Sequence, residues 1–301
     1  MCTGSELRAR RGIASASTNS KGGDMITRQG NSGLPRVLAG FASIATFAVA
    51  LGGCVGEGEP GYESGTESTE QALTSFNSGA WDNSMTPQIL GPSALTTCFL
   101  TRVAGKFSGG GEYVQVAREF GNWVLKGGTQ QASYISASAL CIGDESTTPV
   151  PISWSKGQPS KFLQHDGSCF LTRVVGKFAG GGESVLISQD ANRDWYLSGS
   201  TQTPETIGAS ATCVARAPIS SSSDWAVSGW DWRIASDGHP ATKACFLQGI
   251  KGAFQGSGEQ VYTSHGSTTN YWHLSGFSNS SQGNYTIGAT ASCLGGADSM
   301  H

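Results

Sequence analysis

The chain repeats one unit three times, and each copy is bounded by two cysteines. The copies run from Cys98 to Cys141, from Cys169 to Cys213 and from Cys245 to Cys293. Each opens with Cys-Phe-Leu, continues through a Gly-rich turn ending in Glu and a Trp-x-Leu-x-Gly motif, and closes on Ile-x-Ala-x-Ala-x-Cys. Such internal repetition indicates that one small supersecondary unit is used three times.

Hydrophobic residues alternate with period two inside each copy, which is typical of half-buried strands. In the second copy, Val185 and Ile187 share one strand face, and Trp195 and Leu197 share another. We therefore expect four strands per copy, in the segments Cys-to-Phe, Glu-to-Ile, Trp-to-Gly and Ile-to-Cys. The 43 glycines and the low charged content of 14% agree with short strands joined by turns.

A further strand or loop is expected before the first cysteine of each copy. It is expected around Trp81, around Trp154 and around Trp230 or Trp232, although these upstream segments align poorly. The small alanines of the closing strand would let a neighbouring Trp pack closely.

Six of the eight cysteines come as one pair per copy. Six cysteines allow 15 connectivities, and repeat symmetry favours Cys98–Cys141, Cys169–Cys213 and Cys245–Cys293. The predicted fold is all-β, with three tandem, homologous, disulfide-stapled units at 76–148, 149–219 and 220–301. They are expected to be small domains that touch one another. The alternative is one pseudo-threefold body, like a β-trefoil or a β-prism.

Residues 1–53 have the composition of an N-terminal extension followed by a secretory signal. Arg28 and Arg36 precede the uncharged, mostly apolar run 37–53. Residues before Met25 fit no signal, so translation starts at either Met1 or Met25. An ordinary signal peptide and a membrane-spanning helix are the alternatives to a lipoprotein signal, although the run is short for spanning.

The run ends in "LGGC", which resembles the lipobox of bacterial lipoproteins. The resemblance implies cleavage by signal peptidase II, lipidation of Cys54 and anchoring in the bacterial cell envelope, at the outer membrane or cell surface. Residues 54–75 contain five Glu after Cys54 and no Lys or Arg, so we expect a flexible acidic tether. A tether ending in "EQAL" after a lipobox resembles the exported lipoproteins of myxobacteria.

The Gly-rich turn resembles a phosphate-binding loop only superficially. Such a loop precedes a helix, whereas "GGGE" is followed by "YVQV" or "SVLI", which predict strands. A tight turn between strands explains the glycines better. The fixed glutamates, Glu112, Glu183 and Glu259, are expected either to tie down their own turns, through the local backbone or through Lys106 and Lys177, or to accept sugar hydroxyls.

The tryptophans divide into two groups. Those of the Trp-x-Leu-x-Gly motif, Trp123, Trp195 and Trp272, share a strand face with leucines and are expected in the core. Candidate stacking platforms for a ligand lie elsewhere, at Trp81, Trp154, Trp225, Trp230 and Trp232.

Composition and motifs favour a binding protein over an enzyme. No Gly-x-Ser-x-Gly or His-Glu-x-x-His occurs, and the absence of Cys-x-x-Cys and of a repeated His disfavours zinc. We expect no catalytic residues, no metal and no cofactor. A formal net charge of −3 disfavours nucleic acid as a partner.

Three linked copies suggest multivalent binding, because linked weak sites gain avidity. The predicted function is a cell-envelope lipoprotein that binds glycans or other surface ligands. Its repeats loosely resemble β-rich modules of bacterial adhesins and secreted proteins. A structural envelope lipoprotein without a soluble ligand and a secreted hydrolase are the alternatives.

Overall fold

A computed structural model describes residues 75–295, except 95, 132, 144–149, 203, 205, 219–222, 227–231, 236–242, 267–270 and 280–286. The described residues belong to one compact unit. The predicted signal, Cys54, the tether and Trp230 lie outside them. Within the described part, every regular element is a β-strand, which confirms the all-β prediction.

Each unit contributes six strands in the same order. Unit 1 contains β1 (Ser75–Asp82), β2 (Gln88–Pro92), β3 (Thr96–Gly105), β4 (Tyr113–Glu119), β5 (Asn122–Gly128) and β6 (Ile135–Gly143). Unit 2 contains β7 (Ile152–Ser155), β8 (Lys161–His165), β9 (Ser168–Gly176), β10 (Ser184–Gln189), β11 (Asp194–Ser200) and β12 (Ile207–Val214). Unit 3 contains β13 (Ser223–Ala226), β14 (Trp232–Ala235), β15 (Lys243–Lys251), β16 (Gln260–His265), β17 (Trp272–Phe277) and β18 (Gly288–Gly295).

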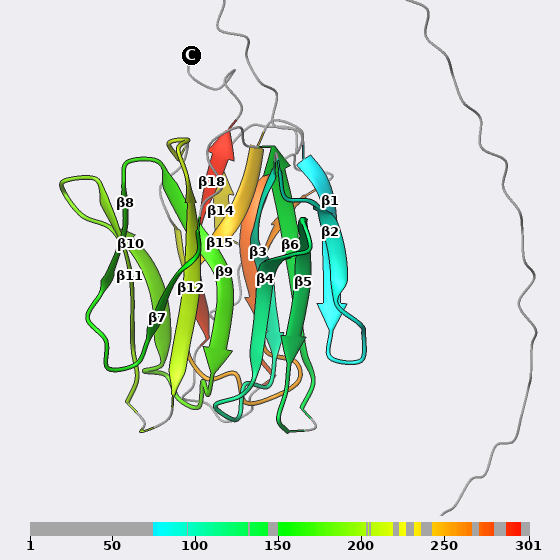
Figure 1. Ribbon diagram of the computed structural model, residues 1–301. Coiled ribbons are helices and arrows are strands. Elements are labelled where there is room, and N and C mark those ends of the chain that lie inside the picture. Colours follow the sequence, from blue (N-terminus) through cyan, green and yellow to red (C-terminus); the bar gives the residue numbers. More distant parts are fainter. Residues whose placement is uncertain are drawn as a thin grey trace, which may run out of the picture. The chain divides into compact units, whose positions relative to one another are not determined.

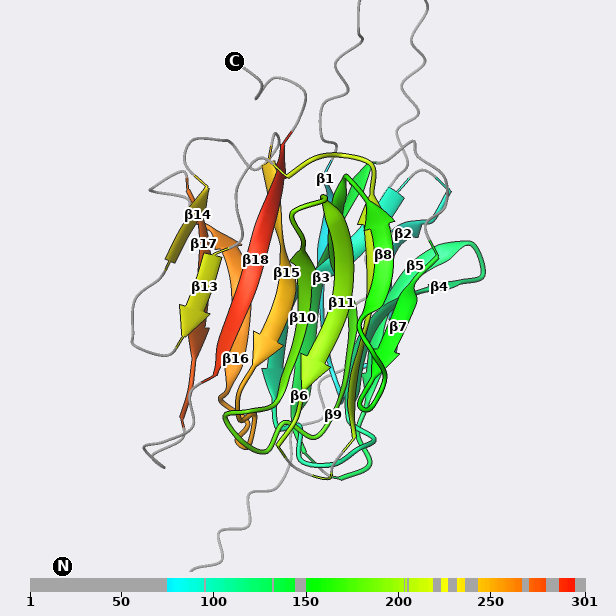
Figure 2. The same cartoon turned by 90° about the vertical axis from the view of Figure 1, so that its left-hand side faces the viewer.

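The described strands form three six-stranded antiparallel sheets, and each sheet is shared by two units. Sheet A has the order β1-β6-β3-β16-β17-β14, sheet B has β2-β5-β4-β9-β12-β7, and sheet C has β13-β18-β15-β10-β11-β8. Figure 2 shows β18, β15, β10 and β11 of sheet C side by side, and Figure 1 shows β12, β9 and β4 of sheet B. The seams between units are the pairs β3–β16, β4–β9 and β10–β15.

The three predicted disulfides are confirmed. Each joins the third and sixth strands of one unit, at the cross-strand pairs Cys98–Cys141, Cys169–Cys213 and Cys245–Cys293. The three stapled units are therefore present. They contact one another through shared sheets rather than as separate domains. Their arrangement is therefore the pseudo-threefold body that was the alternative prediction.

Two layers of phenylalanine hold the units together from within. Phe99, Phe170 and Phe246, one per unit, lie with ring centroids 5.0 Å apart. A second triad, Phe107, Phe178 and Phe254, has centroid separations of 6.0 Å. All six side chains have no exposed surface. Edge-to-face packing of buried rings adds to the hydrophobic contribution of their area, so each unit completes the core of the other two.

A ring of backbone hydrogen bonds closes the second phenylalanine layer. The N–H of Phe178 donates to the carbonyl of Phe107 (3.0 Å), that of Phe254 donates to Phe178 (2.9 Å), and that of Phe107 donates to Phe254 (2.8 Å). The bonds run from unit to unit and return to the start. Closure of this ring requires all three copies.

The Gly-rich turn lies between two strands, as predicted. These strands are not partners in one sheet, because β3 lies in sheet A and β4 in sheet B. Before each Gly-rich turn stands a glycine with a positive φ, a conformation that favours glycine. These glycines are Gly105, Gly176 and Gly252, and φ is +111° at Gly176. The N–H of Gly176 donates to the carbonyl of Glu112 of unit 1 (2.8 Å). The turn is thus a corner that also bonds adjacent units.

The glycine of Trp-x-Leu-x-Gly makes room for a tryptophan from the upstream strand. A Cβ on Gly199 would lie 2.5 Å from the ring of Trp154 and would also contact the carbonyl of Ser184. Trp81 meets Gly127 in unit 1 in the same way, and in unit 3 the ring that meets Gly276 belongs to Trp225. The expected strand near Trp232 is present as β14. The ring that packs against the glycine, however, belongs to Trp225 on β13, which is 4% exposed and is therefore no stacking platform.

Replacing Gly199 with alanine is expected to lower the free energy of unfolding by about 1–3 kcal/mol, since overpacking of a fixed core has this cost. Gly181→Ala is the matched control, because a Cβ there would meet nothing within 4 Å. Urea unfolding of both variants measures the difference. Equal stability of the two variants would contradict the close Trp154 contact.

Candidate functional site

The three fixed glutamates are buried, which contradicts the hypothesis that they bind sugar hydroxyls. Glu112 and Glu183 have no exposed surface, and Glu259 has 1%. A carboxylate inside the body cannot reach a ligand on its surface. The alternative, that each glutamate ties down its own turn, fits directly at Glu183, where Oε2 accepts a hydrogen bond from the N–H of Gly180 (2.7 Å).

The three residues before each glutamate have separate roles. The first must be glycine, because a Cβ on Gly109, Gly180 or Gly256 would lie 2.5–3.0 Å from the carboxylate of its own turn. The third position lies against a side chain from a later loop. In unit 2, for example, Gly182 contacts Gln202. The middle position is open at Gly181, which explains why unit 3 can carry Ser257 there.

The predicted stacking tryptophans are core residues where the structure describes them. Trp81 is 4% exposed and Trp154 5%, and each pairs across strands with an alanine, Ala137 and Ala209. The expectation that small alanines accept a tryptophan is confirmed, and the stacking hypothesis for Trp81 and Trp154 is wrong, because their rings are covered. Trp230 lies outside the described residues, and only the backbone of Trp232, at the start of β14, is described.

The tryptophans of Trp-x-Leu-x-Gly lie in the core, as predicted. Trp123, Trp195 and Trp272 are at most 7% exposed. The indole N–H of Trp123 donates to the carbonyl of Thr96 (2.6 Å), and that of Trp195 donates to Gly167 (3.0 Å). These three rings are core residues rather than stacking platforms.

The outer face of each seam carries one position that differs between the units. The fourth residue after the first Cys is Arg102 in unit 1, Arg173 in unit 2 and Gly249 in unit 3. Across the seam these residues pair with Tyr262, Gln115 and Leu186, respectively. The pseudo-threefold body therefore has three chemically different outer faces.

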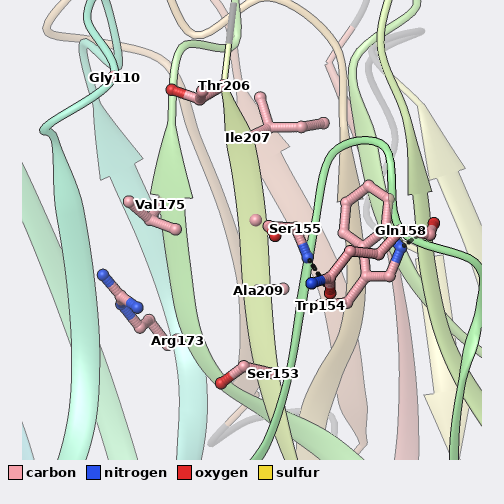
Figure 3. A pocket seen from close by; sticks show the side chains of 11 residues that line it. Gly110, Ser153, Trp154, Ser155, Gln158, Arg173, Val175, Thr206, Ile207 and Ala209 are labelled. Carbon is pink, nitrogen blue, oxygen red and sulfur yellow. Dashed lines mark hydrogen bonds between the residues drawn. The ribbon is translucent and has the colours of Figure 1, made fainter.

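The outer face of sheet B contains a hollow of about 300 Å³, which we call the sheet B hollow. Its walls come from β7, β9 and β12 and from the Gly-rich turn of unit 1 (Figure 3). The lining residues are Gly110, Ser153, Trp154, Ser155, Gln158, Arg173, Val175, Thr206, Ile207, Gly208 and Ala209. The volume is at the lower end of the range for small-molecule sites.

Polar groups surround an apolar floor in the sheet B hollow. Ser153 Oγ lies 2.8 Å from Ser210 Oγ, and the Gln158 loop is fixed by the indole N–H of Trp154, which donates to its carbonyl (3.0 Å). Val175 provides apolar surface beside them, whereas the side chain of Ala209 lies in the core (Figure 3). Such a combination can hold a ring that has one apolar face and several hydroxyls.

Arg173 is the charged residue of the sheet B hollow. Its guanidinium carbon lies 5.4 Å from the ring centroid of Tyr113, a cation–π contact across the seam. Its Nε is buried and has no hydrogen-bond partner. The equivalent Nε of Arg102 in sheet A instead donates to Gln260 Oε1 (3.0 Å). Of these two arginines, only Arg102 makes a hydrogen bond through Nε.

Sheet C has a smaller hollow of about 150 Å³ where Gly249 replaces the arginine. Leu186, Lys251 and Thr290 are among the residues that line it. Leu186 is 36% exposed. This hollow has an apolar wall, one cation and the hydroxyl residues Ser184 and Thr290, but it has no arginine and half the volume of the sheet B hollow.

A cluster of charged residues lies at the turns of sheet C. His165 Nδ1 is 2.8 Å from Asp194 Oδ1, and Arg193 Nε is 2.8 Å from Asp166 Oδ1. The hydrogen bond with Asp194, followed by the charge of Asp166, raises the pKa of His165. The His165 side chain is 62% exposed, and the cluster contains no nucleophile, so a solvated surface network accounts for it. The other acid–histidine pair in the sequence, Asp237 and His239, lies outside the described residues.

Comparison with models of known protein families gave no match, and a search among curated proteins found no match either. In the described part of the chain, no three His, Cys, Asp or Glu side chains gather as metal ligands would. No helix among the described residues is long and apolar enough to span a membrane. The sheet B hollow is therefore the candidate site, on its geometry alone.

Of the residues that line the sheet B hollow, Trp154 was singled out from the sequence as a binding candidate and Gly110 as part of the Gly-rich turn, but the polar residues were not. Only the fourth residue after the first Cys carried a signal, because it is Arg in two copies and Gly in the third. Ser153, Gln158 and Thr206 are ordinary loop and edge residues, and nothing in a strand pattern brings them to one place.

Proposed function

We propose that this protein is an exported lipoprotein of the bacterial cell envelope that binds glycans or other surface ligands. The sheet B hollow carries the proposal, since it places hydroxyl, amide and guanidinium groups around an apolar floor on an outer face. Sugars are recognised by this combination of hydrogen bonds and apolar contact. The earlier candidates, the repeated glutamates and the upstream tryptophans Trp81 and Trp154, are replaced by this hollow.

Three disulfides in the body fit an extracytoplasmic location, where such bonds persist. Anchoring of many copies on a membrane would raise avidity for a surface ligand, even when each site is weak. The three outer faces differ in sequence, so we expect the sites of one molecule to differ in preference.

The proposal is tested with the full chain on a dense array of immobilised glycans. Binding that is competed by the same glycan in solution supports it, whereas no binding at any density contradicts it. Stoichiometric co-purification with an envelope protein, without glycan binding, would favour the structural lipoprotein. Turnover of a polysaccharide would favour the hydrolase.

The lipid anchor is tested separately. Cys54→Ala should release the protein from the membrane fraction, because the thiol that would carry the lipid is absent. Cys2→Ala is the matched control and should leave the distribution unchanged. Retention of the Cys54 variant in membranes would refute the assignment of Cys54.

A further inference from the structure

We infer that the sheet B hollow selects ligands that carry a carboxylate, and that Arg173 binds it. This inference rests on the proposed glycan-binding function and names the class of sugar: acidic sugars such as uronic acids.

Among the described residues, Arg173 has no acidic side chain within ion-pair distance. Its Nε–H is buried without an acceptor, and no Asp or Glu is among the residues that line the hollow. A buried donor that makes no hydrogen bond is destabilising by itself. An anion bound in the hollow beside the half-buried guanidinium would supply the missing opposite charge.

The geometry of an arginine suits a carboxylate. The planar guanidinium offers parallel N–H donors that match two carboxylate oxygens, and such charge-assisted bonds are stronger than neutral ones. The ring of Tyr113 contacts the guanidinium carbon at 5.4 Å and restricts where the group can lie. A positioned arginine loses less freedom when it binds.

The rest of the hollow suits the remainder of a sugar ring. Ser153 and Ser155 are exposed hydroxyls on the side of β7, Thr206 is exposed on the opposite rim, and Val175 lies between Thr206 and Arg173 (Figure 3). The Gly-rich turn of unit 1 comes close to this rim, since a Cβ on Gly110 would lie 2.7 Å from Thr206 Oγ1. A hexuronic acid would present its carboxylate to Arg173 and its hydroxyls to the serines.

Unit 1 provides an internal control. Arg102 holds the equivalent position in sheet A, but its Nε already donates to Gln260 (3.0 Å). Unit 3 has Gly249, which carries no charge. Arg102 is therefore satisfied within the fold, and selectivity for an anion is expected to depend on Arg173.

The experiment measures binding of the full chain to immobilised oligogalacturonate and to its methyl ester, which has the same backbone without the charge. We expect the acid to bind at least about 10-fold more tightly than the ester, and Arg173→Gln to remove this difference. Arg102→Gln should leave it unchanged. Arg173→Lys keeps the charge but loses the paired donors, so it should bind the acid more weakly than the native chain, and it serves if Arg173→Gln does not fold.

Equal binding of acid and ester, or an unchanged preference in a folded Arg173→Gln variant, would overturn the inference while the glycan-binding function stands. Binding to neither probe, nor to any glycan on the array, would remove the proposed function itself. Polyglutamate is the third probe, because an acidic peptide also presents carboxylates. Binding to polyglutamate without binding to oligogalacturonate would overturn the assignment to acidic sugars.

Discussion

Replacing Phe178 with alanine is expected to lower the free energy of unfolding by about 3–5 kcal/mol. Its ring has no exposed surface and contacts the rings of Phe107 and Phe254, each 6.0 Å away between centroids. Removal of the ring leaves a cavity where the three units meet, and no unit can fill it without leaving its own sheet. Urea unfolding followed by tryptophan fluorescence measures the loss.

The position of Phe178 makes this prediction a test of the whole architecture. Because its layer is shared, the variant should destabilise all three units together, and unfolding should remain one transition. Phe277→Ala is the matched control, since the side chain of Phe277 is 52% exposed, and we expect a change within about 0.5 kcal/mol. A separate early transition that involves unit 2 alone would show that the units are independent.

The sequence predicted the strands and disulfides well because both depend on local pattern. Alternation of apolar residues marks a strand and its buried face, and three aligned copies locate the loops where lengths vary. The pairing of Cys169 with Cys213 followed from symmetry between copies. These features are repeated within each unit and need no knowledge of how the units assemble.

Strand partners could not be predicted in the same way. Strand β10 pairs with β11 of its own unit on one side and with β15 of unit 3 on the other. Val185 and Ile187 would be buried with any partner at that second edge. Alternation fixes which residues point inward, but it does not identify the neighbouring strand. The shared sheets, and with them the sheet B hollow at a seam, therefore became visible only in three dimensions.

The equivalence of Trp225 to Trp81 and Trp154 was missed for a similar reason. Trp81 precedes Cys98 by 17 residues and Trp154 precedes Cys169 by 15, whereas Trp225 precedes Cys245 by 20. Because the spacing varies in this segment, it does not identify Trp225 as their equivalent. A better signal was available, because Gly276 and Ala289 each need one large cross-strand neighbour, as Gly199 and Ala209 do in unit 2. The glutamates were open to a binding hypothesis because sequence does not show whether an acidic residue is buried.

Removal of one disulfide, by changing Cys169 and Cys213 together to alanine, is expected to lower the free energy of unfolding by about 2–5 kcal/mol. The bridge joins residues 44 positions apart and restricts the unfolded chain, which is the main source of its stabilisation in the loop-entropy model. Denaturant unfolding of the purified variant, compared with the native chain under non-reducing conditions, measures the effect.

The other two bridges give the control that separates loop entropy from packing. They span 43 and 48 residues, and the entropy of loop closure changes only slowly with length. The Cys98/Cys141 and Cys245/Cys293 double variants should therefore lose nearly the same stability as the Cys169/Cys213 variant. A large difference among the three would mean that packing around each sulfur pair, rather than loop closure, determines what the bridge contributes. A loss below about 1 kcal/mol in all three would mean that the shared sheets stabilise the body without the staples.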